Sequence, residues 1–249
     1  MKDQKVGIIV QARMGSSRLP GKVLKTLSQE ETVLDVLIKR LKLSKRVDEI
    51  IIATTKKKGD SLIIDVAKSH NVSFFLGSEN NVLERHYQAA EKFNLDIIIR
   101  ITSDCPFVDP KVLDDMIIFY LDNEYEFIRN RNLENTTNFA HGFDTEIFSF
   151  VILKKIYLKA TTDMEKEHVT YYVTIHLDEF NMFYYNLEDL KKFDDLRLTI
   201  DYKEDFIFCK EIYKKLIEKG KPINFSVYDI LDIIEENQEL MNINKKYNK

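Results

Sequence analysis

The feature that most constrains the fold is a short apolar segment at residues 6–10, which runs without a break into a basic, glycine-containing loop at residues 11–22. An apolar run without alternation is typical of a strand that is covered on both faces within a parallel sheet. Open α/β sheets bind ligands at the edge where such strands end. The chain therefore predicts a buried strand followed by a ligand-binding loop.

The loop has the composition of a phosphate-binding segment. Its cations carry donors suited to phosphate oxygens, and they are Arg13, Arg18 and Lys22. Gly15 and Gly21 allow the backbone to approach a ligand closely or to adopt a positive φ angle. An exposed basic turn is the alternative, and the loop is neither a Walker A sequence nor a dinucleotide fingerprint. We interpret it as a phosphate-binding loop of another kind.

Apolar strands and amphipathic helices alternate along the first half of the chain. The spacing predicts strands at residues 47–55, 72–77 and 96–102, and helices at 32–41, 61–70 and 82–91. Thr32 is the expected N-cap of the first helix. This alternation indicates an α/β fold with a parallel sheet and right-handed crossovers.

The second half is predicted to be more mixed. We expect helices at residues 111–121, 150–160, 163–173 and 203–219, and a last one from 226 or 229 to 241. A strand is expected at 125–129, an exposed loop at 130–138, and antiparallel edge strands or a small flap at 181–187 and 195–200. The tail at 242–249 is polar and expected to fray.

Asp104 follows the strand at 96–102, beside the expected position of the first loop. A carboxylate there could hold Mg²⁺, which uses one or two carboxylates together with phosphates and waters. The alternative is a helix-capping aspartate. Asp109 is better placed for that task, because Pro110 after it favours the first helical position. Asp104 is therefore predicted to be free for a metal ion.

Bulk properties exclude several classes of protein. A chain of 249 residues with 44% hydrophobic and 31% charged residues is typical of one large globular α/β domain. A net charge of −4 argues against a nucleic-acid binder. With only Cys105 and Cys209, no metal-type cysteine pairing and no apolar run of membrane-spanning length, we expect a soluble, cytoplasmic protein without membrane insertion.

The loop sequence resembles the signature of the CMP-sugar-acid synthetase superfamily, which includes the CMP-sialate and CMP-Kdo synthetases, and is most similar to its SpsF-like branch. Further segments match the family's motifs in order, at residues 77–85, 100–106, 142–148, 167–170 and 197–205. Two positions depart from the pattern: Asn81 stands where an aspartate is usual, and Tyr171 where a proline is usual. Both lie near the expected substrate side.

The resemblance implies a Rossmann-like, GT-A-like nucleotidyltransferase fold with a mixed, mostly parallel sheet. It implies a single domain over residues 1–249, with a small β insertion and homodimer contact at about 130–195. The implied activity is transfer of CMP from CTP to an acidic sugar or related hydroxy acid, with release of pyrophosphate, for surface polysaccharide or glycan synthesis. The implied cofactor is Mg²⁺ or Mn²⁺.

The resemblance also implies the site residues. The catalytic group is Arg13, Lys22, Asp104 and Asp201, with Asp104 and Asp201 as metal ligands. The nucleotide-binding group is Gln11, Ala12, Arg13, Gly15, Ser16, Arg18, Lys22, Thr54, Ser78, Arg85 and Thr102. The substrate-binding group is Arg100, Asp144, Glu146 and His168.

Several of these residues have ordinary structural alternatives. Arg85 could be a surface cation, and Asp144 and Glu146 could lie on a solvated face of one strand. His168 could only fasten a helix, and Asp201 could be an N-cap. Two other functions remain open: a GT-A glycosyltransferase that uses a nucleotide-sugar, and a non-catalytic nucleotide-binding protein.

Overall fold

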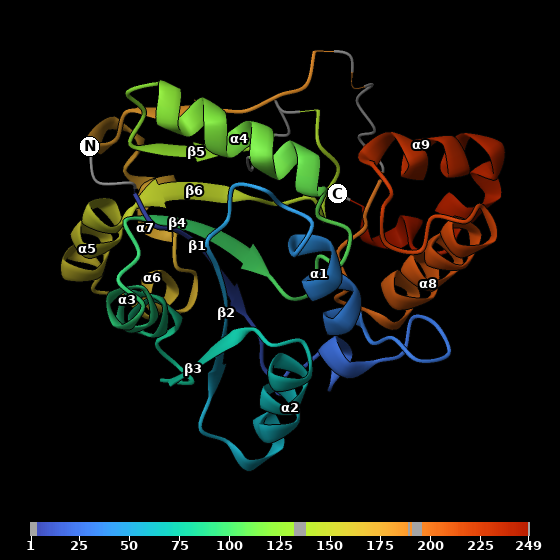
Figure 1. The fold of residues 1–249 in the computed structure, drawn as a ribbon, viewed down its shortest axis with the longest axis horizontal. Helices are drawn as coiled ribbons and strands as arrows, with labels where there is room; N and C mark the ends of the chain where they lie inside the picture. The colour runs from blue at the N-terminus through green and yellow to red at the C-terminus, as the bar shows by residue number, and fades with distance from the viewer. Residues whose placement is uncertain (1–3, 132–137, 189, 191–195, 249) are drawn as a thin grey trace.

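The computed structural model describes residues 4–131, 138–188, 190 and 196–248 and contains one seven-stranded sheet in the order β3-β2-β1-β4-β6-β5-β7 (Figure 1). The strands are β1 (Val6–Gln11), β2 (Glu49–Thr55), β3 (Ser73–Gly77), β4 (Ile97–Thr102), β5 (Phe127–Arg129), β6 (Glu146–Ser149) and β7 (Met182–Tyr184). Strands β3, β2, β1 and β4 are parallel, while β6 runs antiparallel to both β4 and β5. The sheet is therefore mixed and mostly parallel, as the sequence predicts.

The position of β1 determines where a ligand can bind. β1 is the central strand of the parallel part and pairs with β2 on one side and β4 on the other. The chain leaves β1 toward β2, whereas β4 lies on the opposite side of β1. Such a reversal of strand order opens a crevice beyond the carboxyl ends of the two strands. The loop after β1 and the segment after β4 meet at that crevice.

Helices cover both faces of the sheet. They are α1 (Val33–Leu41), α2 (Ser61–Ser69), α3 (Val82–Lys92), α4 (Pro110–Asp122), α5 (Phe150–Lys159), α6 (Asp163–Glu167), α7 (Tyr171–Ile175), α8 (Lys203–Glu218) and α9 (Val227–Glu236). One buried cluster joins a sheet face to α1, α2, α4, α8 and α9, and the other joins the opposite face to α3, α5 and α7. Figure 1 shows α3, α5 and α6 on one flank and α8 and α9 on the other.

Helix starts follow the predicted caps. Thr32 and Asp35 form a capping box at the start of α1. The carboxylate of Asp109 accepts hydrogen bonds from the backbone N–H groups of Lys111 and Val112 at the start of α4. The predicted task of Asp109 is therefore confirmed.

Three predicted elements differ in the structure. The helix expected at 163–173 is two short helices, α6 and α7, because the backbone leaves the helical conformation at His168. β7 pairs with β5 in parallel and not antiparallel. Residues 196–200 form no strand and make one isolated parallel bridge, between His141 and Arg197; position 195 lies outside the described residues. The short strands of this part are set by tertiary contacts, which alternation alone does not specify.

Three polar residues are placed differently from the expectation. Asn130 is buried, with its side chain bonded to backbone groups of Phe143 and Thr145, while 132–137 of the expected loop lie outside the described residues. Asn244, in the expected frayed tail, is buried and donates to the backbone oxygen of Arg197. Asp144 precedes β6 and does not share its strand face with Glu146. Polar side chains that satisfy buried backbone groups explain these differences.

Among the residues that the structure describes, no helix combines the length and the apolar character needed to cross a membrane.

Candidate active site

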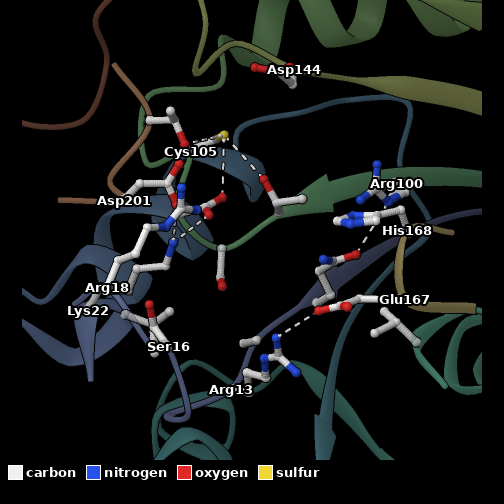
Figure 2. A pocket seen from close by; sticks show the side chains of 18 of the residues that line it. Arg13, Ser16, Arg18, Lys22, Arg100, Cys105, Asp144, Glu167, His168 and Asp201 are labelled. Carbon is white, nitrogen blue, oxygen red and sulfur yellow. Dashed lines mark hydrogen bonds and ion pairs between the residues drawn. The ribbon is translucent and has the colours of Figure 1, made fainter. Parts of the chain in front are cut away.

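A cavity of about 540 Å³ lies beyond the carboxyl ends of β1 and β4. Its walls come from the first loop, the start of α3, the end of β4, the turn at 141–144, the junction of α6 and α7, and the segment at 199–201. Figure 2 shows Arg18, Lys22 and Asp201 on one side of it and Arg100, Glu167 and His168 on the other. Segments far apart in the sequence thus meet at the crevice that the strand order opens.

One side of the cavity is built around a shared cation. The ammonium of Lys22 donates to Asp104 Oδ2 at 2.7 Å and to Asp201 Oδ1 at 3.0 Å. Burial alone would lower the pKa of Lys22, but the two carboxylates outweigh it and raise that pKa. Burial would likewise raise the pKa of Asp104, and the charge of Lys22 lowers it instead. Lys22 and Asp104 are therefore both charged at neutral pH.

Asp201 receives two further cations. Arg18 Nη2 donates to Asp201 Oδ1 at 2.7 Å, and Arg197 Nη2 donates to Asp201 Oδ2 at 2.6 Å. Asp201 does not cap α8, because Asp205 takes that task by accepting from the backbone N–H groups of Asp201 and Tyr202. The structure thus removes the alternative of an N-cap and leaves the Asp201 carboxylate at the cavity.

Gly21 sets the position of Lys22. Gly21 has φ +66°, in the left-handed region that favours glycine, and it starts the short 3₁₀ turn Lys22–Leu24. Gly21 therefore adopts the positive φ angle that the sequence analysis allows for it. Gly15 has no positive φ angle and does not line the cavity.

Arg85 is a buried cation without an ionic partner. It is 1% exposed, and its one hydrogen bond to a described residue runs from Nη1 to the carbonyl oxygen of Ser78. Within the described part of the chain its Nε has no partner and no carboxylate lies at ion-pair distance. Burial, followed by the nearby charge of Arg13, lowers the pKa of Arg85 to about 10. The alternative of a surface cation, paired with Glu84 or Glu91, is therefore wrong.

Arg100 is held by a network at the sheet. Its Nη1 donates to Glu146 Oε2 at 2.7 Å, and its Nε donates to Gln11 Oε1 at 3.3 Å. Glu146 also accepts from Thr170 Oγ1 at 2.9 Å, which ties the start of α7 to β6. Glu146 does not line the cavity; Arg100 does. Glu146 therefore acts on the cavity through Arg100.

The junction of α6 and α7 supplies two more side chains. Glu167 Oε1 accepts from Arg13 Nη2 at 3.3 Å across the cavity, and both side chains are partly exposed. His168 follows Glu167 and lines the same wall. The helical backbone is interrupted at His168, and both Glu167 and His168 line the cavity at this interruption.

The donor set fits a divalent cation held together with a phosphate ligand. In the described ranges, no group of three or more His, Cys, Asp or Glu side chains could hold a metal ion. Asp104 and Asp201 nevertheless contact one and the same cation, the Lys22 ammonium, so the space between them accepts positive charge. Two carboxylates suit Mg²⁺, which completes its shell with waters and phosphate oxygens.

Most of the predicted site residues line the cavity. These are Gln11, Ala12, Arg13, Ser16, Arg18, Lys22, Arg85, Arg100, Thr102, Asp104, Asp144, His168 and Asp201. Four do not: Gly15, Thr54, Ser78 and Glu146. Thr54 is fully buried within β2, and Ser78 contacts Arg85 and the backbone of Asn81.

The structure adds lining residues that the sequence analysis left out: Ser17, Val23, Val82, Ser103, Cys105, His141, Glu167 and Thr199. Most are direct neighbours in sequence of predicted residues. Thr199 lies within the motif segment at 197–205, and His141 lies directly before the one at 142–148. Which of two adjacent residues lines the cavity depends on the conformation of the turn that carries them. The spacing of residues in the sequence does not determine that conformation.

Comparison with known proteins gives a consistent result. Over residues 7–243 the chain matches the family described as Cytidylyltransferase. The spore coat polysaccharide biosynthesis protein SpsF of Bacillus subtilis is 34% identical over 238 residues, which cover 93% of this chain and 94% of that protein. The solved structure of a cytidylyltransferase from Leptospira borgpetersenii is 36% identical, with a TM-score of 0.88, and covers 96% of this chain and 97% of that one.

A more distant structure shares the fold. A CMP:2-keto-3-deoxy-manno-octonic acid synthetase solved with CTP has a TM-score of 0.58 at 14% identity, over 87% of this chain and 100% of that chain.

Proposed function

The chain belongs to the cytidylyltransferase family and is a nucleotidyltransferase, and from that premise we propose that it transfers CMP from CTP to an acidic sugar or related hydroxy acid. A hydroxyl oxygen of the acceptor forms a bond to the α-phosphorus of CTP, and its proton is released to solvent. The bond from the α-phosphorus to the oxygen that bridges it to the β-phosphate breaks, and pyrophosphate leaves. The name of the Bacillus subtilis relative supports a product used in surface polysaccharide synthesis.

One observation carries this proposal: cations of the first loop and two carboxylates converge in a single cavity at the ends of β1 and β4. The cations are Arg13, Arg18 and Lys22, and the carboxylates are Asp104 and Asp201. Phosphoryl transfer depends on positioning and on neutralising charge, and needs no protein nucleophile. A cavity with this donor set supports that chemistry.

The first loop is proposed to bind the triphosphate. Arg13 and Arg18 offer forked guanidinium donors, and Lys22 offers a compact charge. Together they stabilise the charge that develops on the leaving pyrophosphate, where preorganised donors have their largest effect. Arg13 and Arg18 are partly exposed, so an entering ligand can reach them.

Asp104 and Asp201 are proposed to hold Mg²⁺ or Mn²⁺. A bound divalent cation would supply charge neutralisation and polarisation at the α-phosphate. The Lys22 ammonium now lies between the two carboxylates. Its flexible stem allows it to turn to a phosphate oxygen when the carboxylates bind another cation.

The acceptor is proposed to bind at the wall formed by Arg100, Asp144 and His168. Arg100 provides a positive charge for an acidic group, and Asp144 provides an acceptor for hydroxyl groups. Glu146 holds Arg100 in place from behind. The acidic class of the acceptor is therefore supported by this wall.

Thermal unfolding with ligands tests the proposed nucleotide. The protein is heated with Mg²⁺ alone and with Mg²⁺ plus CTP, UTP, ATP, GTP or a nucleotide-sugar. A ligand at about one hundred times its dissociation constant adds about 2.7 kcal/mol to the free energy of unfolding. We expect a selective, Mg²⁺-dependent shift with CTP. A shift only with a nucleotide-sugar would instead support a GT-A glycosyltransferase.

Release of pyrophosphate tests the reaction. We expect CTP-dependent release that requires an acidic sugar, with 3-deoxy-manno-octulosonate (Kdo) and N-acetylneuraminate as the first acceptors. Release that does not depend on any added acceptor would contradict the transfer reaction. No release and no CTP shift together would overturn the proposed function.

A homodimer is part of the same proposal, with its contact in the region at about 130–195. Five large apolar side chains in the described part of this region are exposed by 45% or more: Val151, Leu158, Met164, Ile175 and Leu177. A second copy of the chain would cover them. Light scattering of the purified protein should give twice the 29.4 kDa chain mass, and a monomeric mass would reject this part.

A further inference from the structure

Arg197 makes three contacts from one guanidinium group, and the third of them determines the chemistry of a neighbouring histidine. Its Nη2 donates to Asp201 at 2.6 Å and its Nε donates to Asp205 at 3.1 Å. Its Nη1 lies 2.8 Å from Nδ1 of His141. A guanidinium has five N–H donors and no acceptor. Nδ1 of His141 must therefore be the acceptor in this contact.

An imidazole whose Nδ1 accepts a hydrogen bond is neutral and carries its proton on Nε2. Protonation of Nδ1 would set one N–H group against another. Burial lowers the pKa of His141, in agreement with a neutral ring. Arg197 thus fixes both the charge and the tautomer of His141.

The backbone around His141 is held as firmly as its ring. Gly142 has φ +115°, and a Cβ there would come within 2.5 Å of the backbone carbon of Leu198. The carbonyl oxygen of His141 accepts a hydrogen bond from the backbone N–H of Leu198 at 2.6 Å. Only glycine permits this close approach, which brings the turn against the segment that carries Arg197 and Asp201.

The second ring nitrogen is the one left for a ligand. His141 lines the cavity, and no hydrogen bond from its Nε2 to any described residue is found. The turn that carries it also supplies Asp144 to the cavity. Figure 2 shows Asp144 on the side away from Arg13 and Ser16 of the first loop. The turn therefore contributes to the part of the cavity where Asp144, a residue of the proposed acceptor wall, is found (Figure 2).

We propose that His141 is an acceptor-binding residue, which donates a hydrogen bond from Nε2 to a hydroxyl or carboxylate oxygen of the sugar acid. This inference rests on the proposed function. It adds a donor that is fixed, neutral and unable to act as a base, because the lone pair of Nδ1 is occupied by Arg197. The hydrogen bond from Nε2 selects sugar acids that have an oxygen within its reach. An analogue without that oxygen binds less well, because Nε2 loses its water and gains no partner.

Two substitutions separate the two nitrogens. In His141→Asn the side-chain oxygen can take the place of Nδ1 and accept from Arg197, but no donor reaches the position of Nε2. In His141→Gln the longer amide can place an N–H donor near the position of Nε2, while the contact with Arg197 is lost. The pair therefore tests binding and structure independently.

With saturating CTP and Mg²⁺ and with Kdo or N-acetylneuraminate as acceptor, we expect His141→Asn to raise the acceptor KM about tenfold. The CTP dissociation constant, measured by titration calorimetry, should stay within about twofold of the wild-type value. His141→Gln should restore most of the acceptor affinity. If His141→Asn is normal and His141→Gln is impaired, the residue only supports Arg197 and the proposal is overturned.

Nitrogen NMR of the histidine side chains gives a readout that does not need turnover. In wild-type protein labelled with ¹⁵N-histidine, the resonances missing from His141→Asn identify His141. We expect a neutral ring protonated on Nε2 at pH 7, and a change at Nε2 when Kdo or N-acetylneuraminate is added with CTP. An imidazolium, an Nδ1–H tautomer, or no change with either acid would overturn the inference.

These measurements keep the two proposals apart. Absence of both a CTP shift and pyrophosphate release is a failure of the proposed function. A wild-type enzyme that releases pyrophosphate while His141→Asn keeps its acceptor KM is a failure of the inference about His141 alone.

Discussion

The ammonium of Lys22 lies 2.7 Å from Asp104 and 3.0 Å from Asp201, so one lysine of the first loop joins two carboxylates from distant parts of the chain. The side chain of Lys22 is only 12% exposed. Because each carboxylate follows a different segment at the carboxyl edge of the sheet, the ammonium also fixes how these segments sit together. This contact leads to the first prediction.

Lys22→Met should destabilise the protein at neutral pH. It leaves two partly buried carboxylates close together without the ammonium, and the expected cost is about 1–3 kcal/mol of unfolding free energy at pH 7. Lys22 lowers the pKa of Asp104 below 3.8, so this contribution is present above that pH and is lost as the pH falls through the native value. The deficit of the variant should therefore shrink at acidic pH.

Urea unfolding of wild type and Lys22→Met at pH 7 and at pH 2, well below the ordinary carboxyl pKa of 3.8, checks this expectation. An equal deficit at both values would show that the lost ion pairs are not the cause.

Asp104→Asn and Asp201→Asn should each lower kcat by about 10²–10³-fold while the protein stays folded. The amide keeps the shape of the side chain and removes the negative charge that the proposed metal site needs. Pyrophosphate release measures the rate, and circular dichroism measures folding. Asp232→Asn is the matched control, because Asp232 is an exposed carboxylate on α9. Wild-type turnover in both site variants would reject the metal assignment.

Arg85→Met should separate stability from binding. The guanidinium is buried without a carboxylate partner, and burying a charge in that state is unfavourable. Met has a similar length and no charge, so we expect the unfolding free energy to stay level or rise by about 1 kcal/mol. If Arg85 contributes to nucleotide binding, CTP affinity should fall by about tenfold or more.

The thermal shift with CTP gives both quantities for Arg85→Met in one experiment. A variant with a lower melting temperature and normal CTP binding would show that Arg85 has only a structural task.

Glu146→Ala should be strongly destabilising. Glu146 contacts Arg100 at 2.7 Å and Arg129 at 4.0 Å, and its loss leaves two guanidinium groups without a counter-charge at the sheet. Breaking a buried pair from one side costs about 3–5 kcal/mol. Chemical unfolding measures this loss. Glu218→Ala, at an exposed position in the last turn of α8, is the control and should change stability by less than about 0.5 kcal/mol.

A cost for Glu146→Ala no larger than that of Glu218→Ala would mean that Arg100 and Arg129 find other partners.

His86 should make the protein acid-sensitive. Burial lowers its pKa from 6.5 to about 3, and its Nε2 has no partner among the described residues. Because the native pKa lies below the unfolded one, the unfolded state binds the proton more readily between these values. Stability is therefore full above pH 6.5 and falls as the pH drops toward 3, by about 1.4 kcal/mol per unit.

His86→Leu should remove this part of the pH dependence. Unfolding free energies of wild type and variant, measured from pH 7.5 to pH 5, give the difference directly. Parallel curves would show that His86 is not the group that titrates.

The first half of the fold could be predicted in detail because its signals are local. Long apolar strands and capped amphipathic helices can be recognised from residues that are close together in the sequence, as the Thr32 and Asp109 caps illustrate. The region from β5 onward could not be predicted in the same detail. Its strands are three or four residues long, and their formation depends on the strands beside them. The break at His168 and the parallel pairing of β7 follow from such contacts.

The sequence by itself determined the chemical inventory of the site: a basic loop after the first strand, carboxylates after two later segments, and their common edge of the sheet. Residue type, apolar runs and strand order are enough for that, because parallel strands deliver their ends to one edge. Only the tertiary structure decided which of these groups touch. The shared cation of Asp104 and Asp201, the unpaired burial of Arg85 and the tautomer of His141 each depend on distances between residues far apart in the chain, and no local pattern encodes those distances.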